Sequence, residues 1–162
     1  MAHDTREHLH KLLSKFEHAM LVSRTAEGRM HARPMAVAHL SPGSDAFFVT
    51  SLQSPKIAEI EADPDVLVTF QGGGAHASIA GRARVVRDRL LLERYWAHAW
   101  TAWFPKGLAD PDLCVIAVLA DEGEYWDRAG VQAVKYAFEA ARAYVAGERP
   151  QLGRDQHAKV KL

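Results

Sequence analysis

"VTSLQSPKIAEIEADP", residues Val49 to Pro64, joins an apolar run to a short helix whose charges are in reverse order. The part from Ser54 to Ala62 has a helical pattern, and the "DPD" segment around Pro64 ends it. Lys56 lies in the first turn and acids follow it, although a helix macrodipole favours anions at its start and cations at its end. An anion bound at the helix start would explain this order.

Several groups around this helix start are suited to binding an anion. Ser54 is placed as the N-cap and Pro55 as the first helical residue, and no Glu or Gln follows at the capping-box position. The Ser54 hydroxyl, the Lys56 ammonium and the free backbone donors of the first turn would together bind a phosphate. Thr50 and Ser51 add two hydroxyls at the end of the preceding strand. The alternative is an exposed lysine without a ligand, because the macrodipole effect is only about 0.3 to 1 kcal/mol.

Arg33 is a further candidate ligand for the same anion. It lies in the strand-like segment "MHARPMAV" beside Pro34, and a proline inside a strand indicates an edge position or a bulge. Its guanidinium would either donate to the phosphate or remain a surface charge. The acids that follow Lys56 are expected only to keep the outer helix face soluble; they are Glu59, Glu61 and Asp63.

The rest of the pattern predicts a small antiparallel barrel with peripheral helices. Amphipathic spacing predicts one helix over residues 4–17 and another over 88–100. Hairpin and turn signals separate six predicted strands, at 18–25, 29–40, 46–51, 66–70, 76–86 and 113–127. Gly81, inside the fifth strand, predicts a bulge or a close backbone approach. Short hairpin connections favour an antiparallel barrel over βαβ units with a parallel sheet.

Length and composition predict one domain of a soluble protein. We place this domain at residues 1–146, including a C-terminal helix over 131–145, and a polar tail at 147–162. Its 20 basic and 20 acidic side chains give no net charge, which argues against nucleic acid as a partner. No run reaches the roughly 18 apolar residues of a membrane span, so a cytoplasmic location is expected.

Cysteine and histidine usage predicts no metal site. Cys114 is the single cysteine and lies in an apolar run, which predicts a buried, inert thiol. The nine histidines lack the spacing of zinc-ligand sets.

Six motifs occur in the order found in one known family. They are "RPM" at Arg33 to Met35, "TS" at Thr50 and Ser51, "SPK" at Ser54 to Lys56, "IAGRARV" at Ile79 to Val85, "AWFP" at Ala102 to Pro105 and "EYWD" at Glu124 to Asp127. With these motifs the chain resembles the general stress protein 26-type branch of the pyridoxamine 5'-phosphate oxidase-like superfamily of FMN-binding split barrels.

This resemblance implies a six-stranded split barrel that forms a homodimer with a flavin at each end of the subunit interface. The flavin phosphate would lie on Lys56 and Ser54, and the other subunit would add residues of the "AWFP" loop and Trp126. The alternative for the tryptophans is a core or interface role. The implied cofactor-binding set is Arg33, Pro34, Met35, Val49, Thr50, Ser51, Ser54, Lys56, Trp103 and Trp126.

The implied function is that of an FMN-binding flavoprotein of the general stress protein type, an oxidoreductase whose electron acceptor and catalytic residues are unidentified. FAD or the deazaflavin F420 are the alternative cofactors. The C-terminal "RPQLGRDQHAKVKL" lacks the R-L-H-x-R type segment of true pyridoxamine phosphate oxidases. Oxidation of pyridoxamine phosphate is therefore not expected. The alternatives are a non-catalytic flavin-binding, sequestering or sensing dimeric module, and a deazaflavin-dependent split-barrel reductase.

Overall fold

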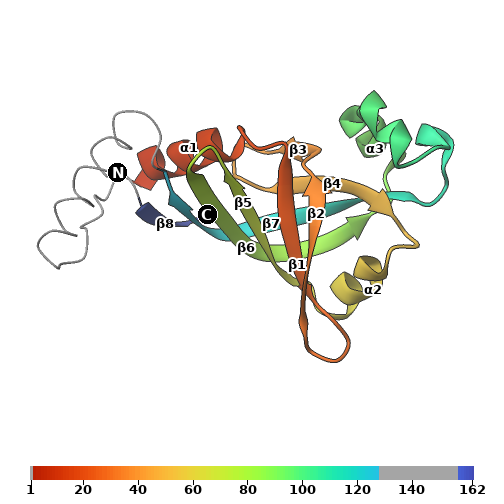
Figure 1. Ribbon diagram of the computed structural model, residues 1–162, viewed down its shortest axis with the longest axis horizontal. Helices are drawn as coiled ribbons and strands as arrows, with labels where there is room; N and C mark the ends of the chain where they lie inside the picture. Colours follow the sequence, from red (N-terminus) through yellow and green to blue (C-terminus); the bar gives the residue numbers. More distant parts are fainter. Residues whose placement is uncertain (1, 128–156) are drawn as a thin grey trace, which may run out of the picture.

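The computed structural model describes residues 2–127 and 157–162, and strands dominate this part of the chain (Figure 1). The elements, in chain order, are α1 (Ala2–Leu13), β1 (His18–Arg24), β2 (Met30–Ala36), β3 (His39–Leu40), β4 (Ala46–Ser51), α2 (Pro55–Ala62), β5 (Asp65–Gly72), β6 (Ala75–Val86), α3 (Arg89–Tyr95), the 3-10 turns η1 (His98–Ala102) and η2 (Gly107–Ala109), β7 (Leu113–Trp126) and β8 (His157–Lys161). None of the described helices is long and apolar enough to cross a membrane.

The strands form one curled antiparallel sheet in the order β2-β1-β5-β6-β7-β4-β3, with β8 paired to β7. This arrangement confirms the predicted split-barrel fold with peripheral helices. Two strands were not predicted. The short β3 separates from β2 within the segment read as a single strand, and β8 lies in the segment read as a polar tail. The predicted helix over 131–145 lies outside the described residues.

The strands β4 and β7 each contribute residues to both hydrophobic clusters of the described chain. Successive residues of a strand point to opposite faces, so Phe48 and Ile116 enter the main core while Val49 and Val115 enter a smaller second cluster. Partly buried aromatic residues, including Trp100 and Phe104, pack against the second cluster. The segment that follows α3 therefore lies against the outer face of β4 and β7.

The strand β6 contains the irregularity predicted at Gly81. Its pairing with β7 shifts register between Ala80 and Gly81. A Cβ at Gly81 would overlap the backbone carbonyl of Leu119 on β7, so only glycine fits this approach.

The helix predicted over 88–100 is shorter than expected. Asp88 caps α3 by accepting the backbone N–H groups of Leu90 and Leu91. The helix ends at Tyr95, and the chain continues through the extended residues Trp96 and Ala97 into η1. The aromatic side chains of this segment pack on the second cluster instead of continuing a helical face: Trp96 makes an edge contact with Trp100, with ring centroids 5.9 Å apart. In Figure 1 this segment lies toward the opposite end of the sheet from α1.

Candidate functional site

A cavity of about 370 Å³ opens where β2, the end of β4, the start of α2 and the η1 segment meet. This volume is in the range of small-molecule pockets, about 300 to 1,000 Å³. Six of the predicted site residues line it. The complete lining is His18, Pro34, Met35, Ala36, Val49, Thr50, Lys56, Trp100, Trp103 and Phe104.

Lys56, in the first turn of α2, lines this cavity. The chain turns sharply after β4, with the Ser54 N–H donating to the Ser51 carbonyl at 3.0 Å, and α2 then begins at Pro55. Ser54 has the extended backbone of an N-cap, but its hydroxyl makes no capping hydrogen bond. That hydroxyl instead accepts from Lys56 Nζ at 2.6 Å, and the Thr50 hydroxyl accepts from the same atom at 2.9 Å. The predicted grouping of these three side chains is therefore present.

Within the described part of the chain, the buried Lys56 ammonium contacts two neutral oxygens, the hydroxyls of Thr50 and Ser54. The residue is 9% exposed, and no carboxylate among the described residues makes an ion pair with it. Burial lowers the pKa of Lys56 from its ordinary value of 10.5, and repulsion by Arg33 lowers that pKa further. Buried charges are normally paired, because leaving water is costly for an ion. An anionic ligand would supply the missing partner.

Cys114 pairs with Thr50 across β4 and β7. Its side chain is fully buried, and burial raises the pKa of the thiol to about 11. The thiol is therefore protonated at neutral pH, in agreement with the buried, inert cysteine predicted from the sequence.

Arg33 does not line the cavity, and an acid on α2 holds its guanidinium. Arg33 Nη2 donates to Glu59 Oε2 at 2.7 Å, and Arg33 Nη1 donates to the Ser23 hydroxyl at 2.7 Å. The expectation that Glu59 only keeps the helix soluble is wrong. Glu59 lies one helical turn after Lys56 and faces β1 and β2, so its side chain is only 11% exposed.

Three other predicted residues do not line the cavity: Ser54, which contacts Lys56 as described above, Ser51 and Trp126. The Ser51 hydroxyl accepts the backbone N–H of Gln53 at 3.2 Å in the turn before α2. Trp126 ends β7 and stacks on His157 of β8, with ring centroids 4.9 Å apart. Trp126 was expected to serve the site of a second subunit, and this stays a prediction.

Sequence reasoning missed three of the lining residues, namely His18, Ala36 and Trp100. Trp103 and Phe104 belong to the "AWFP" loop, which was expected to reach the site from the other subunit, but they line the cavity of their own chain. The aromatic density of the segment from Trp96 to Phe104 was the available signal for Trp100. No such signal marks His18 or Ala36, because only the pairing of β1 with β2 places them side by side.

Comparison with known protein families identifies the family of this chain. A model of the family described as pyridoxamine 5'-phosphate oxidase like matches residues 4–151, which is most of the chain. The chain belongs to the pyridoxamine 5'-phosphate oxidase-like family. The resemblance inferred from the six motifs is thereby confirmed.

Individual relatives agree with this family assignment. General stress protein 26 of Bacillus subtilis is 27% identical over 115 residues, covering 67% of this chain and 80% of that protein. A solved structure from Jannaschia sp. CCS1, assigned as a general stress protein 26, is 25% identical with a TM-score of 0.74 and covers 100% of both chains. A pyridoxamine 5'-phosphate oxidase-related, FMN-binding protein of Nostoc punctiforme shares the fold at 14% identity, with a TM-score of 0.55 and coverage of 80% and 83%.

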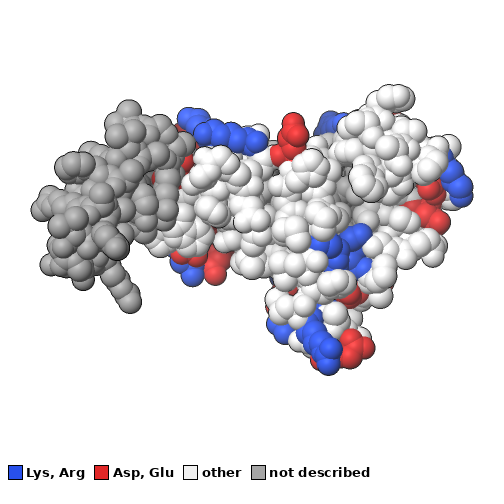
Figure 2. Space-filling view, viewed as in Figure 1, with Lys and Arg blue, Asp and Glu red and all other residues white. Residues whose placement is uncertain are grey.

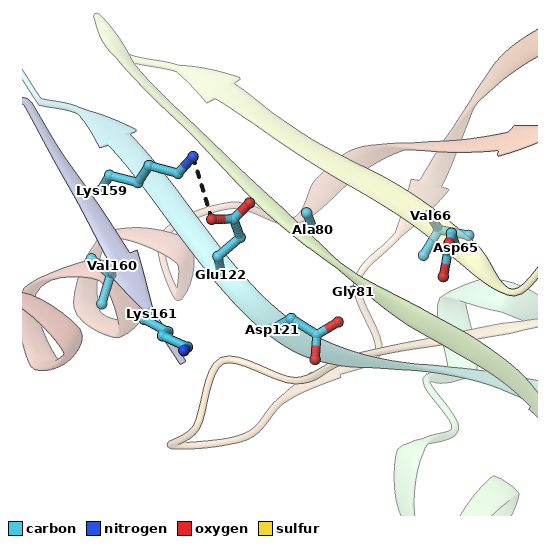
Figure 3. Close-up of a pocket in the computed structure, with 9 residues that line it drawn as sticks. All are labelled: Asp65, Val66, Ala80, Gly81, Asp121, Glu122, Lys159, Val160 and Lys161. Atoms are coloured by element: carbon cyan, nitrogen blue, oxygen red, sulfur yellow. Dashed lines mark ion pairs between the residues drawn. The ribbon is translucent and has the colours of Figure 1, made fainter.

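The chain has a second hollow, of about 790 Å³, between the bulge of β6 and the strand β8 (Figure 3). Its charged side chains oppose one another, and Lys159 Nζ lies 3.3 Å from Glu122 Oε2. Asp65 and Asp121 add further negative charge to the rim. Lys161 also lines this hollow, but it is exposed, so the hollow does not provide a buried cation like Lys56 of the first cavity. Across the described residues, no group of three or more His, Cys, Asp or Glu side chains is arranged to hold a metal ion.

Proposed function

We propose that the cavity at Lys56 binds FMN and that the protein is a flavin-dependent oxidoreductase of the general stress protein type. The observation that carries this proposal is the buried Lys56 ammonium, whose partners among the described residues are the hydroxyls of Thr50 and Ser54. A phosphate accepts from all three groups without a change of fold. Family membership and the FMN-binding relative support the choice of a flavin phosphate.

The rest of the cavity suits a planar ring system. Met35 and Val49 are buried apolar residues on neighbouring walls, and Trp103 stands at the mouth with 81% of its surface exposed. A bound flavin would supply the hydride and electron chemistry, and the protein would supply binding and orientation. Lys56, with Thr50 and Ser54, anchors the phosphate end and thereby sets where the ring can lie.

A homodimer is part of the proposal. Trp103 is among the few large apolar side chains that the described residues expose, and it borders the cavity. In Figure 2, charged side chains are sparse over the strands on the face in view; one group lies at the tip of the β1–β2 hairpin and others lie along the edges of the molecule. A second copy packed over this rim would shield the flavin from water, and light scattering would measure the resulting mass.

The proposal is tested by the absorbance spectrum of the purified protein and by titration of the apo-protein with FMN. Quenching of flavin fluorescence with saturation at one flavin per chain is expected. FAD and the deazaflavin F420, titrated at equal salt, rank the alternative cofactors. A colourless protein that quenches none of these flavins would refute the proposal. Mass spectrometry of the small molecule released from protein purified from its own host identifies the natural cofactor.

A non-catalytic flavin-binding or sensing module is the second candidate. The observation that favours it is the scarcity of proton-transfer groups, because His18 and Lys56 are the only ionisable side chains among the described lining residues. Turnover of reduced nicotinamide with a panel of acceptors separates the two functions. Sustained turnover supports the oxidoreductase, and tight flavin binding without turnover supports the module.

A further inference from the structure

A third hollow, of about 670 Å³, adjoins the proposed flavin cavity. It lies between the end of α1, the start of β1, the end of β2 and the segment from the end of α3 into η1. Four residues line both spaces, namely His18, Ala36, Trp100 and Trp103. We call this space the side hollow. A molecule bound in it would share a wall with the ligand of the flavin cavity.

The shared wall and the proposed phosphate anchor are different parts of the flavin cavity. Lys56 and Thr50 line the flavin cavity but not the side hollow. A flavin held by its phosphate on Lys56 therefore directs its ring system toward the remaining walls, which include Trp100 and Trp103. Transfer of a hydride requires the reacting atoms to approach to about 3 to 3.5 Å. The side hollow is the adjoining space from which a second molecule can reach the ring.

Two aromatic side chains that line the side hollow are fixed by their neighbours. The ring of Tyr95 stacks on that of His39, with centroids 4.7 Å apart and an interplanar angle of 11°, and it contacts Phe47 at 5.4 Å. Trp100 is held by its edge contact with Trp96 and by the second hydrophobic cluster. Aromatic rings attract one another in stacked and edge arrangements. These side chains therefore offer a preformed surface for a flat aromatic molecule.

The charge of the side hollow disfavours an anionic ligand. Its described lining includes the carboxylate of Glu17 but no lysine or arginine. Glu17 is exposed, and a phosphate or carboxylate in the side hollow would meet its negative charge without a cation to offset it. The flavin cavity differs in this respect, because Lys56 lines it. The two adjoining spaces are therefore suited to ligands of different charge.

We infer that the side hollow binds the electron acceptor, and that this acceptor is a flat aromatic molecule without a phosphate or other anionic group. The inference rests on the proposed flavin site and names the chemical class of the acceptor that this site serves. A quinone belongs to this class. Its reduction takes one hydride from the reduced cofactor and one proton from water and releases the hydroquinone, which leaves the cofactor oxidised.

Equilibrium binding to the FMN-loaded protein tests the charge preference without relying on turnover. The probes are dimethylnaphthoquinone, whose quinone ring is blocked against thiol addition, and the same quinone with a sulfonate on its second ring. We expect the uncharged quinone to bind at least about fivefold more tightly, because the sulfonate loses water and meets the Glu17 carboxylate. Equal affinities for the two probes, or tighter binding of the sulfonate, overturn the inference.

Glu17→Gln tests the source of this preference. It should tighten binding of the sulfonated quinone about two- to fivefold and leave the affinity for the uncharged quinone unchanged, since one nearby negative charge is removed. Glu27→Gln is the matched control, because Glu27 is an exposed acid in the turn between β1 and β2 and lines neither space. It should change neither affinity. An unchanged affinity of Glu17→Gln for the sulfonated quinone contradicts the inference.

Ala99→Trp tests where the quinone binds. Ala99 is exposed and lines the side hollow but not the flavin cavity, so an added indole fills the hollow and spares the flavin contacts. Quinone affinity should fall about tenfold or more, and FMN affinity should stay within about twofold of the wild type. Ala102→Trp is the matched control, because Ala102 is also exposed in η1 and lines neither space. It should alter neither affinity.

The FMN titrations separate a failure of this inference from a failure of the proposed function. If the wild type binds no FMN, the proposed function fails and this inference fails with it. If the wild type binds FMN and Ala99→Trp leaves quinone binding unchanged, only the inference is wrong. A lower mass of Ala99→Trp in light scattering with unchanged quinone binding would show that the side hollow is a contact between two copies of the chain, which also overturns the inference.

Discussion

Replacement of Lys56 by methionine should separate ligand binding from folding. Methionine keeps an unbranched side chain of similar length and removes the ammonium that contacts Thr50 and Ser54. A charge-assisted hydrogen bond is worth about 1.5 to 3 kcal/mol. At about 1.4 kcal/mol for each tenfold change, the dissociation constant for FMN should rise about 12- to 150-fold, while that for riboflavin should change little.

The same substitution should leave the apo-protein at least as stable as the wild type. The Lys56 ammonium is buried and is not ion-paired with any carboxylate that the structure describes, and its lowered pKa shows that burial disfavours the charged form. Replacing a buried charge by an apolar group of similar volume is often neutral or stabilising. The free energy of unfolding is therefore expected to be unchanged within about 1 kcal/mol, or higher.

The measurements are FMN and riboflavin titrations followed by fluorescence, and urea unfolding of the ligand-free protein. Lys106→Met is the matched control, because Lys106 is exposed and does not line the cavity. Wild-type FMN affinity in Lys56→Met would refute the assignment of the lysine. A loss of more than about 2 kcal/mol of apo-protein stability would show that the lysine is mainly a structural residue.

Three further predictions concern the same site and the sheet beneath it. FMN affinity should fall as pH rises through the pKa of Lys56, which lies below its ordinary 10.5, because only the protonated amine binds the phosphate. Lys56→Arg should abolish this loss of affinity at alkaline pH, and FMN titrations across pH test both expectations. Trp103→Ala should weaken FMN binding several-fold and leave the melting temperature unchanged. Leu90→Ala, which removes another exposed side chain, should alter neither the FMN affinity nor the melting temperature. An equal effect of the two substitutions would remove Trp103 from the site. Gly81→Ala should destabilise the protein by about 2 to 4 kcal/mol in urea unfolding, since its Cβ would overlap backbone on β7, while Gly43→Ala, which has room, serves as the control.

The features of the site that were predicted correctly depend on short-range chemistry. Ser54, Pro55 and Lys56 lie within one helical turn, so capping preference and proline geometry already indicate a helix start with a cation and a free hydroxyl. Thr50 is only six residues from Lys56, across a tight turn that brings the two side chains together. Alternating and apolar runs likewise predicted the main strands, because strand burial repeats every two residues.

The misjudged features depend on contacts between distant parts of the chain. Glu59 and Arg33 are 26 residues apart, and no local pattern shows that α2 turns this acid toward β2. The strand β8 has too little apolar content to be predicted as a strand, and it forms because β7 offers a free edge to Ala158 and Val160. The helix predicted over 88–100 was too long because its aromatic residues pack on the second hydrophobic cluster.

The sequence by itself determined the family, the antiparallel barrel and the presence of a lysine at a helix start suited to phosphate, because these depend on periodicity, capping and motif order within short segments. Only the tertiary structure decided the charge of the site. In the folded chain, Lys56 is buried with two hydroxyls as partners, and Arg33 pairs with Glu59. The packing of β1, β2 and α2 decides which charged groups meet, because an ion pair in a partly buried environment forms where packing brings opposite charges together.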